Sequence, residues 1–208
     1  MSDNVLNTVG YAIFTRNLLI YNLTNSDLPD NMKSYLNTTC STQNSCLGNI
    51  FPEISSNYPN SFVEVEMVVT KAPTTNISIS QIQITFMGDV ICRIKHSNVE
   101  VLKFSVELNA FVNATVDKMV LKGNVTRLTP TVQVINSSLI SLSSDALSQA
   151  VETLGNSILL PFLNKKCEEG IPIPFPSSTF QFKNLEMDML DHCLRITTDI
   201  KRVKMNTG

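Results

Sequence analysis

Three features of this 208-residue sequence place reactive residue types at spacings that catalysis uses. Cys193 directly follows His192, so a thiol and a general base are neighbours in the sequence. Glu64 and Glu66 are two residues apart, and on a strand this spacing brings two carboxylates to one face, as acid–base catalysis requires. His96, the other of the two histidines, lies in the segment RIKHSN.

These features do not predict an active site. Adjacent residues of a strand point to opposite faces, which separates Cys193 from His192, and both histidines fall at expected turns, where they are solvated. Glu64 and Glu66 alternate with apolar residues and are expected on the wet face of a strand. The chain has no Gly-x-Ser-x-Gly elbow, no His-Glu-x-x-His motif and no phosphate-binding glycine loop. We therefore expect a protein that is not an enzyme and uses no cofactor or metal ion.

The five cysteines and the Asn-x-Ser/Thr sequons bear on the compartment of the protein. Cys40 and Cys46 enclose a polar loop that can close as a small disulfide ring, and the odd number leaves at least one cysteine free or paired outside the chain. About four sequons would arise by chance in a chain this rich in Asn, Ser and Thr, so they permit secretion without establishing it. The candidate glycosylation sites are Asn22, Asn37, Asn76, Asn113, Asn124 and Asn136.

Composition excludes several classes of partner. The chain is 43% hydrophobic and 16% charged, with a net charge of −2 and scattered lysines and arginines. Nucleic acids and anionic membrane surfaces both require a concentrated basic patch, so neither is expected as a partner. No apolar run approaches the roughly 20 residues of a transmembrane helix. No secretory signal follows Met1.

Most of the chain alternates between apolar and polar residues with a period of two. The longest such run covers residues 104–116, from Phe104 to Val116, and predicts a strand about twice the usual length. One apolar and one polar face indicate an antiparallel sheet that is wet on one side. At this length the sheet must twist and curl around whatever covers its apolar face.

Two segments have helical periodicity, one strong and one weak. Residues 144–166 carry a single apolar stripe, with Pro161 expected to kink the helix and Gly170 expected to end it. Residues 3–16 form the weaker candidate. After the second helix, IPIPFP is expected to be an extended connector to a final hairpin. The order of elements predicts a single α+β domain over residues 1–208.

Four segments of the sequence are distinctive: NTVGYAIFTRNLLIYNLTNSDLP, YPNSFVEVEMVVTKAP, EEGIPIPFP and LRITTDI. Together they resemble the carboxy-terminal domain of the lipid-transfer/lipopolysaccharide-binding family, which includes bactericidal/permeability-increasing protein. The resemblance runs from about Asn4 to Ile200 and keeps the order of the segments. Its most specific part is the pattern Glu-Gly-apolar-Pro-apolar-Pro after a long helix.

The resemblance implies a fold and a function. The implied fold is a long, highly twisted antiparallel sheet wrapped around a long helix, with a second helix alongside, and with acyl chains held in an apolar tunnel between them. The implied activity is non-enzymatic binding or transfer of a phospholipid or other acyl lipid, in an extracellular protein. The alternative is an interaction module that docks an amino-terminal lipid-binding domain or a receptor and has a vestigial pocket. The residues expected to line the tunnel are Val5, Val9 and Ile13 on the first helix and Leu147, Val151, Leu154 and Ile158 on the second.

The chain also departs from the family pattern. It resembles only the second half of two-domain members, so we expect either a fragment of a longer protein or a stand-alone descendant. Endotoxin recognition in the family depends on a basic tip of the amino-terminal domain, and it is not expected in this slightly acidic chain. Cys167 and Cys193 are a second candidate disulfide, because the helix end and the last strand could meet.

Overall fold

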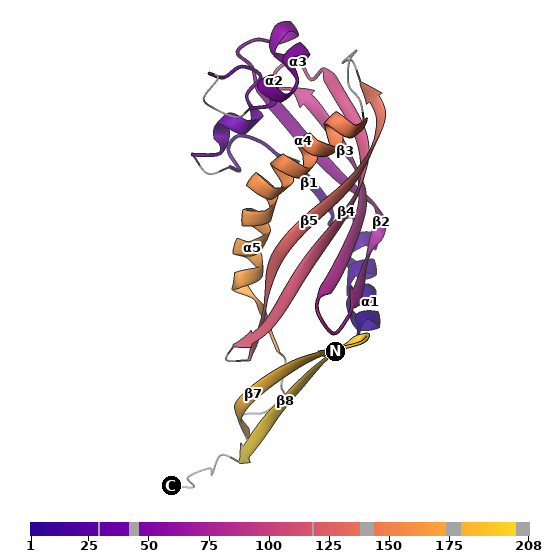
Figure 1. Ribbon diagram of the computed structural model, residues 1–208, viewed down its shortest axis with the longest axis vertical. Coiled ribbons are helices and arrows are strands. Elements are labelled where there is room, and N and C mark those ends of the chain that lie inside the picture. The colour runs from indigo at the N-terminus through magenta and orange to yellow at the C-terminus, as the bar shows by residue number, and fades with distance from the viewer. Residues whose placement is uncertain (29, 42–45, 118, 138–143, 174–179, 203–208) are drawn as a thin grey trace.

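The computed structural model describes residues 1–28, 30–41, 46–117, 119–137, 144–173 and 180–202. It is an α+β structure in which a curled antiparallel sheet is partly covered by helices, as expected (Figure 1). Among the described residues, no helix is both long and apolar enough to cross a membrane. The elements are α1 (Asp3–Thr15), β1 (Ile20–Leu23), η1 (Lys33–Leu36), α2 (Leu47–Ile50), α3 (Pro52–Asn57), β2 (Val63–Ile77), β3 (Ile82–Ile94), β4 (Glu100–Asp117), β5 (Val120–Ser137), α4 (Ser144–Leu154), η2 (Gly155–Leu159), α5 (Leu160–Glu169), β6 (Ile171–Pro172), β7 (Phe180–Leu190) and β8 (Cys193–Arg202).

The main sheet has six strands in the order β1-β2-β3-β4-β5-β6, so each strand pairs with its neighbour in the sequence. The strand predicted over residues 104–116 is confirmed and is longer, since β4 and β5 have 18 residues each and extend about 60 Å. The ladders contain register shifts between Val69 and Lys71, between Cys92 and Arg93, and between Phe111 and Val112. Such shifts bend and twist strands, and the sheet curls into a half-barrel (Figure 1).

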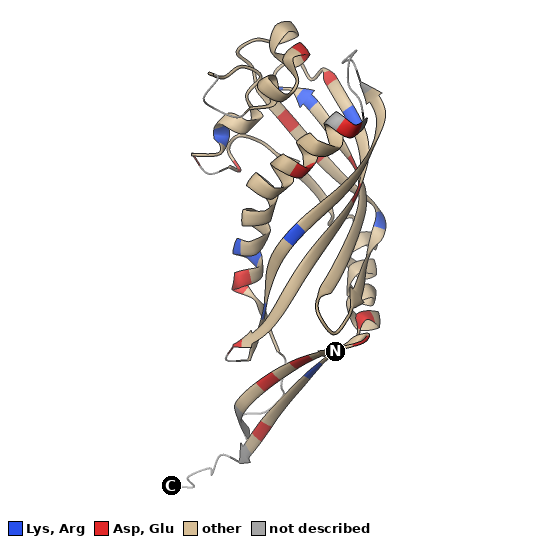
Figure 2. Ribbon diagram, in the orientation of Figure 1, with Lys and Arg blue, Asp and Glu red and all other residues tan. Residues whose placement is uncertain are grey.

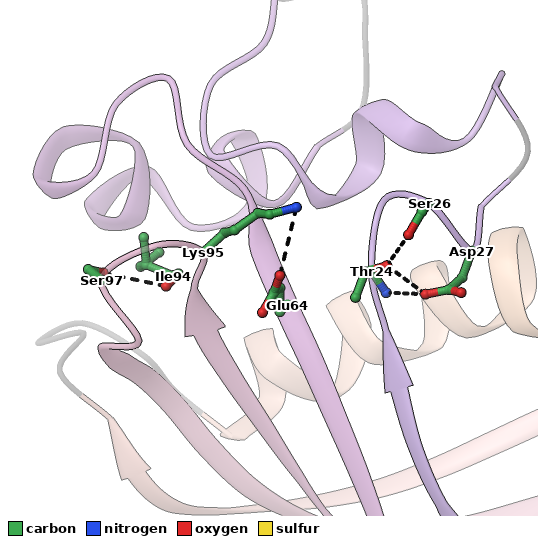
Figure 3. Close-up of polar contacts among 7 residues, drawn as sticks. All are labelled: Thr24, Ser26, Asp27, Glu64, Ile94, Lys95 and Ser97. Atoms are coloured by element: carbon green, nitrogen blue, oxygen red, sulfur yellow. Dashed lines mark hydrogen bonds and ion pairs between the residues drawn. The ribbon is translucent and has the colours of Figure 1, made fainter.

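The polar face of this sheet carries ion pairs between neighbouring strands. Glu66 pairs with Arg93, and Glu64 lies 3.9 Å from the Nζ of Lys95 (Figure 3). The two glutamates that could have formed an acid–base pair are thus partners of Arg93 on β3 and of Lys95 just after it. Figure 2 shows charged residues scattered over the strands and helices, without one face on which a single sign gathers.

The long helix predicted over residues 144–166 is a rod of three segments. α4 is followed by five residues of π-helix, η2, and then by α5. Pro161 was expected to kink the helix, and the irregularity lies in the residues just before it. Proline has no N–H and its ring crowds the carbonyl four residues earlier, and a π-segment widens the helix where that hydrogen bond is lost.

The rod ends as expected at Gly170, which has a φ of +69°. A Cβ at this position would also lie 2.3 Å from Val120 Cγ1, so glycine is required for space as well as for conformation. The connector then begins as β6, whose Ile171 and Pro172 pair with the start of β5. The rest of the IPIPFP segment, residues 174–176, lies outside the described residues.

An asparagine side chain from a helix binds the backbone of each outer long strand. Asn7 of α1 accepts a hydrogen bond from the backbone N–H of Thr75 on β2 (2.5 Å) and donates one to its carbonyl (3.2 Å). Asn164 of α5 makes the same two bonds with Val125 on β5, at 2.6 and 3.0 Å. Each amide completes the hydrogen bonding of a strand edge where no further strand pairs. These two asparagines fix where the helices meet the sheet.

The last hairpin, β7–β8, forms a separate two-stranded sheet next to the beginning of α1 (Figure 1). His192 lies in its turn, where its backbone N–H donates to the Ile77 carbonyl and its Nδ1 lies 2.7 Å from Asp3 Oδ2. The predicted hairpin is therefore present. The histidine next to Cys193 contacts a carboxylate of another element, so it is part of a structural joint.

The hydrophobic core consists of two clusters along the concave face of the sheet. The first lies under η1, α2 and α3, and includes Leu36, Phe51 and Ile54. The second lies near the other end and includes Leu128 and Leu194. The Cys40–Cys46 disulfide closes the segment that leads into α2. Short helices thus cap one end of the half-barrel.

Candidate functional site

An apolar cavity of about 560 Å³ lies between the concave face of the sheet and the α4–α5 rod. This volume is within the range of small-molecule ligand sites, roughly 300 to 1,000 Å³. Its wall on the sheet side includes Leu102, Phe104, Val106 and Leu108 of β4, which are alternate residues and so point to one face. The apolar residues that alternate with a period of two in the sequence thus form one wall of the cavity. Other residues of the wall are Val65, Met67, Val90, Cys92, Leu128 and Pro130.

The predicted stripe of the second helix forms the opposite wall. Leu147, Val151 and Leu154 all line the cavity, and Leu147 is fully buried against the sheet. Ile158 belongs to η2, but its side chain lies outside the described part of the chain. Three of the residues predicted on this helix are therefore brought together at one site.

The predicted stripe of the first helix lies elsewhere. Val5 and Val9 are each 51% exposed and Ile13 is 37% exposed, and none of them lines the cavity. α1 instead meets β2 through Asn7 and Gly10, because the small glycine allows the helix to approach Pro73 closely. The apolar stripe of α1 therefore faces away from the sheet.

The end of the cavity is formed by residues that carry no periodic signal. Leu28, Met32, Leu36 and Phe51 come from irregular segments and short helices between β1 and β2. On the rod, Ala150 and Gly155 also line the cavity. Small residues on the inner face of a helix leave free volume, and an apolar stripe alone does not reveal this.

The cavity opens between the rod and the β1 edge of the sheet. Tyr21 of β1 and Phe162 of α5 line the cavity and are each 40% exposed, so they lie at its mouth. Their ring centroids are 6.1 Å apart with a tilt of 39°, a geometry of favourable aromatic pairs. Partial burial, followed by the nearby charge of Asp27, raises the pKa of Tyr21 above its ordinary value.

Asp27 belongs to the same mouth and is held by the loop that follows β1. Its Oδ2 accepts hydrogen bonds from the hydroxyl of Thr24 at 2.7 Å and from the backbone N–H of Thr24 at 2.8 Å (Figure 3). These bonds lower the pKa of Asp27, so it is a fixed negative charge at neutral pH. The mouth therefore combines aromatic rings with charged groups, whereas the interior is apolar.

The cysteines separate into one disulfide and three free thiols. The predicted Cys40–Cys46 bond is present, and the second candidate pair, Cys167–Cys193, is wrong because both are free. Cys167 packs on β5 beside Gly123, whereas Cys193 starts β8 of the separate hairpin. Cys92 faces the cavity, and burial, followed by the charge of Glu100, raises its pKa from 9.0 to about 12. It remains a protonated thiol and is not activated as a nucleophile.

The sequon asparagines are mostly accessible. Asn37 is the partly buried exception, and its Oδ1 is buried with no hydrogen-bond partner. Their modification remains a prediction. The exposed ones are Asn22, Asn76, Asn113, Asn124 and Asn136.

The described side chains of this site offer mainly apolar contact. Cys92 lines the cavity as a protonated thiol, and among the described lining residues there is no histidine. No group of three or more His, Cys, Asp or Glu residues suited to a metal ion occurs within the described ranges. The arrangement is suited to an apolar molecule.

Comparison with known proteins agrees with this geometry. The family model described as "LBP / BPI / CETP family, C-terminal domain" matches residues 1–202. A solved structure described as "Crystal structure of lipopolysaccharide binding protein" is similar, with a TM-score of 0.60 and 18% sequence identity. That similarity covers 90% of this chain and 41% of the other, so this chain spans less than half the length of that protein. At this identity the structure supports the fold alone, and the family model carries the assignment: the chain belongs to the LBP/BPI/CETP family and matches its C-terminal domain.

Proposed function

We propose that this protein binds an acyl lipid in the cavity between the sheet and the α4–α5 rod, without covalent chemistry. The observation that carries the proposal is a largely apolar cavity of about 560 Å³ whose charged lining residues, Asp27, Glu152, Lys165 and Lys166, are all exposed. Each methylene group transferred from water to such a site contributes about 0.8 kcal/mol. A single acyl chain therefore supplies enough free energy for stable binding, and membership of a lipid-binding family supports the same function.

A pair of variants on one helix tests the proposal. Val151→Asp places a carboxylate on the cavity wall, whereas Gln149→Asp adds the same charge to the exposed side of α4. Uptake of a fluorescent fatty acid should fall at least about tenfold in the first variant, because an acyl chain would desolvate the carboxylate. Uptake by the second variant should match the parent protein.

A chemical measurement complements the variants. Organic extraction of the purified protein followed by mass spectrometry should return phospholipid or fatty acid from the parent protein and less from Val151→Asp. A lipid-free extract together with no uptake of the acyl probe would refute the proposal. Circular dichroism of both variants shows whether any loss reflects unfolding.

We also propose a second role, in which the exposed stripe of α1 docks another domain. Val5, Val9 and Ile13 are apolar, face away from the sheet and are at least one-third exposed. An amino-terminal lipid-binding domain of the same family is the partner that fits, since the matched model describes a C-terminal domain. Co-expression with such a domain should protect the α1 amides from hydrogen exchange. Unchanged protection would exclude this role.

The same resemblance supports an extracellular location. A disulfide persists in oxidising compartments, and five of the six sequon asparagines are exposed. Expression in a secretory host followed by glycosidase digestion tests both points. A mobility shift is expected, and its absence at every sequon would contradict the glycosylated form.

A further inference from the structure

The mouth of the cavity is set by the way in which the rod is attached to the sheet. α4 and α5 pack along β5, where Asn164 binds Val125, whereas β1 on the other side is the edge strand of the sheet in the part of the chain that the structure describes. The opening therefore runs along the β1 side. The lining residues that are also exposed mark its rim: Tyr21, Asp27, Glu152, Pro161, Phe162, Lys165 and Lys166.

Two lysines lie next to the aromatic ring on the rod side of this rim. Lys165 and Lys166 follow Phe162 by three and four residues, so all three lie on neighbouring positions of one helix surface. Both lysines line the cavity and both are exposed. A long lysine stem places its ammonium group at the water boundary while its methylenes contact apolar surface.

Neither lysine is held by a strong ion pair. Lys166 Nζ lies 3.2 Å from Glu169 Oε1, but both side chains are more than half exposed, and such pairs contribute little. Lys165 makes no ion pair with any residue that the structure describes. Both ammonium groups are therefore available to an anionic ligand at little cost.

The carboxylates of the rim are placed differently from the lysines. Asp27 lies beyond β1 and is fixed by Thr24, and Glu152 lies thirteen positions before Lys165, in α4. An anion at the mouth is thus attracted to Lys165 and Lys166 and repelled from Asp27 in the loop after β1. Tyr21 contacts Phe162 on the rod and lies near enough to Asp27 for that charge to raise its pKa, after the larger effect of burial.

We propose that the mouth is a head-group site for a phosphate ester of the bound lipid, with Lys165 and Lys166 as the phosphate-binding residues. This inference rests on the proposed binding of an acyl chain in the cavity. Two adjacent ammonium groups match a phosphate, which carries one or two negative charges and several acceptor oxygens. The acyl chains then extend past Phe162 into the apolar interior.

Binding of matched lipids to a neutralised variant tests this site. Lys165→Gln with Lys166→Gln removes two positive charges at the mouth, and Arg16→Gln with Lys71→Gln removes two exposed charges that do not line the cavity. Each protein is titrated with phosphatidic acid and with diacylglycerol of the same acyl chains. Free glycerol 3-phosphate is added as a competitor in a third experiment.

The mouth variant should bind phosphatidic acid about tenfold more weakly and diacylglycerol unchanged, because two exposed ion pairs are lost. The control variant should bind both lipids like the parent. The head-group site is overturned if the mouth variant keeps its affinity for phosphatidic acid, or loses both lipids equally. It is also overturned if glycerol 3-phosphate competes at the same concentration as the lipid, since the lysines would then bind free phosphate. If the parent protein binds neither lipid, the proposed function itself is wrong.

Discussion

Replacing Gly155 by leucine tests the proposed lipid site, because the substitution should raise the stability of the protein and lower its affinity for lipid. Gly155 lies in η2, lines the cavity, and shares a helix face with Val151 and Leu159, which also line it. A Cβ at this position would meet no heavy atom within 4 Å, so a side chain can be added without a clash. We predict that Gly155→Leu places a leucine side chain in the space that the proposed acyl chain would occupy.

The expected changes in melting temperature and in lipid affinity both follow from the position of Gly155. Replacing a helical glycine removes a penalty of about 0.5 to 1 kcal/mol, which raises the melting temperature by about 1–4 °C in a protein of this size. Leucine adds four carbon atoms, and if these displace three methylenes of a long chain, the loss is about 2.4 kcal/mol. A loss of this size corresponds to an affinity about fiftyfold lower.

The assay compares palmitoyl and octanoyl probes on the parent, Gly155→Leu and Asn156→Leu. Asn156 is in the same π-segment but exposed, and it serves as the control. Gly155→Leu should bind the palmitoyl probe much more weakly and the shorter probe nearly as well as the parent. Unchanged palmitoyl affinity, or an equal loss for both chains, would refute the placement of the acyl chain along this face.

Three further predictions concern the mouth, the attachment of the rod and the buried thiol. Tyr21→Ala removes the ring contact with Phe162 and should speed lipid release to acceptor vesicles about two- to tenfold, since aromatic pairs contribute about 0.5–1.5 kcal/mol. Asn164→Leu leaves the edge groups of Val125 unpaired and should lower the free energy of unfolding by about 2 kcal/mol in urea titrations. For Cys92 the unfolded thiol ionises near pH 9 and the folded thiol near pH 12, so its contribution to stability is present below pH 9 and lost between pH 9 and about 12.

Each of these predictions has an outcome that contradicts it. A release rate of Tyr21→Ala equal to that of the parent would show that the ring contact does not limit exchange. Parent-like stability of Asn164→Leu would show that the edge bonds are replaced by water. For Cys92, the free energy of unfolding of the parent protein is compared with that of Cys92→Ala as the pH rises, so that the contributions of other titrating groups cancel. A difference that stays constant between pH 9 and about 12 would refute the prediction.

The sequence predicts the elements with strong periodicity and the cavity walls that they form. Alternate residues of β4 and the stripe with Leu147 and Val151 identify the two surfaces that face each other. The first helix shows the limit of this reasoning. Its apolar stripe is real, but Gly10 and Asn7 determine which side meets β2, and a hydrophobic pattern contains no information on close approach or edge hydrogen bonding.

The sequence carries no comparable signal for the residues that close the end of the cavity or for those at its mouth. Leu36 and Phe51 line the cavity from segments in which apolar residues follow no regular spacing. Tyr21 and Phe162 are far apart in the chain and meet only because β1 and α5 flank the opening. Such contacts depend on tertiary arrangement, which local patterns do not encode.

The attachment of the rod has a consequence for how the proposed lipid would enter and leave the cavity. Two hydrogen bonds of Asn164 tie α5 to Val125 of β5, whereas on the opposite side the rod meets β1 through the contact between the rings of Tyr21 and Phe162. Opening on that side separates side chains but breaks no hydrogen bond of the sheet. If a lipid enters on that side, its exchange does not require unfolding of the sheet, and we expect amides of β3 and β4 to keep their slow hydrogen exchange while lipid exchanges.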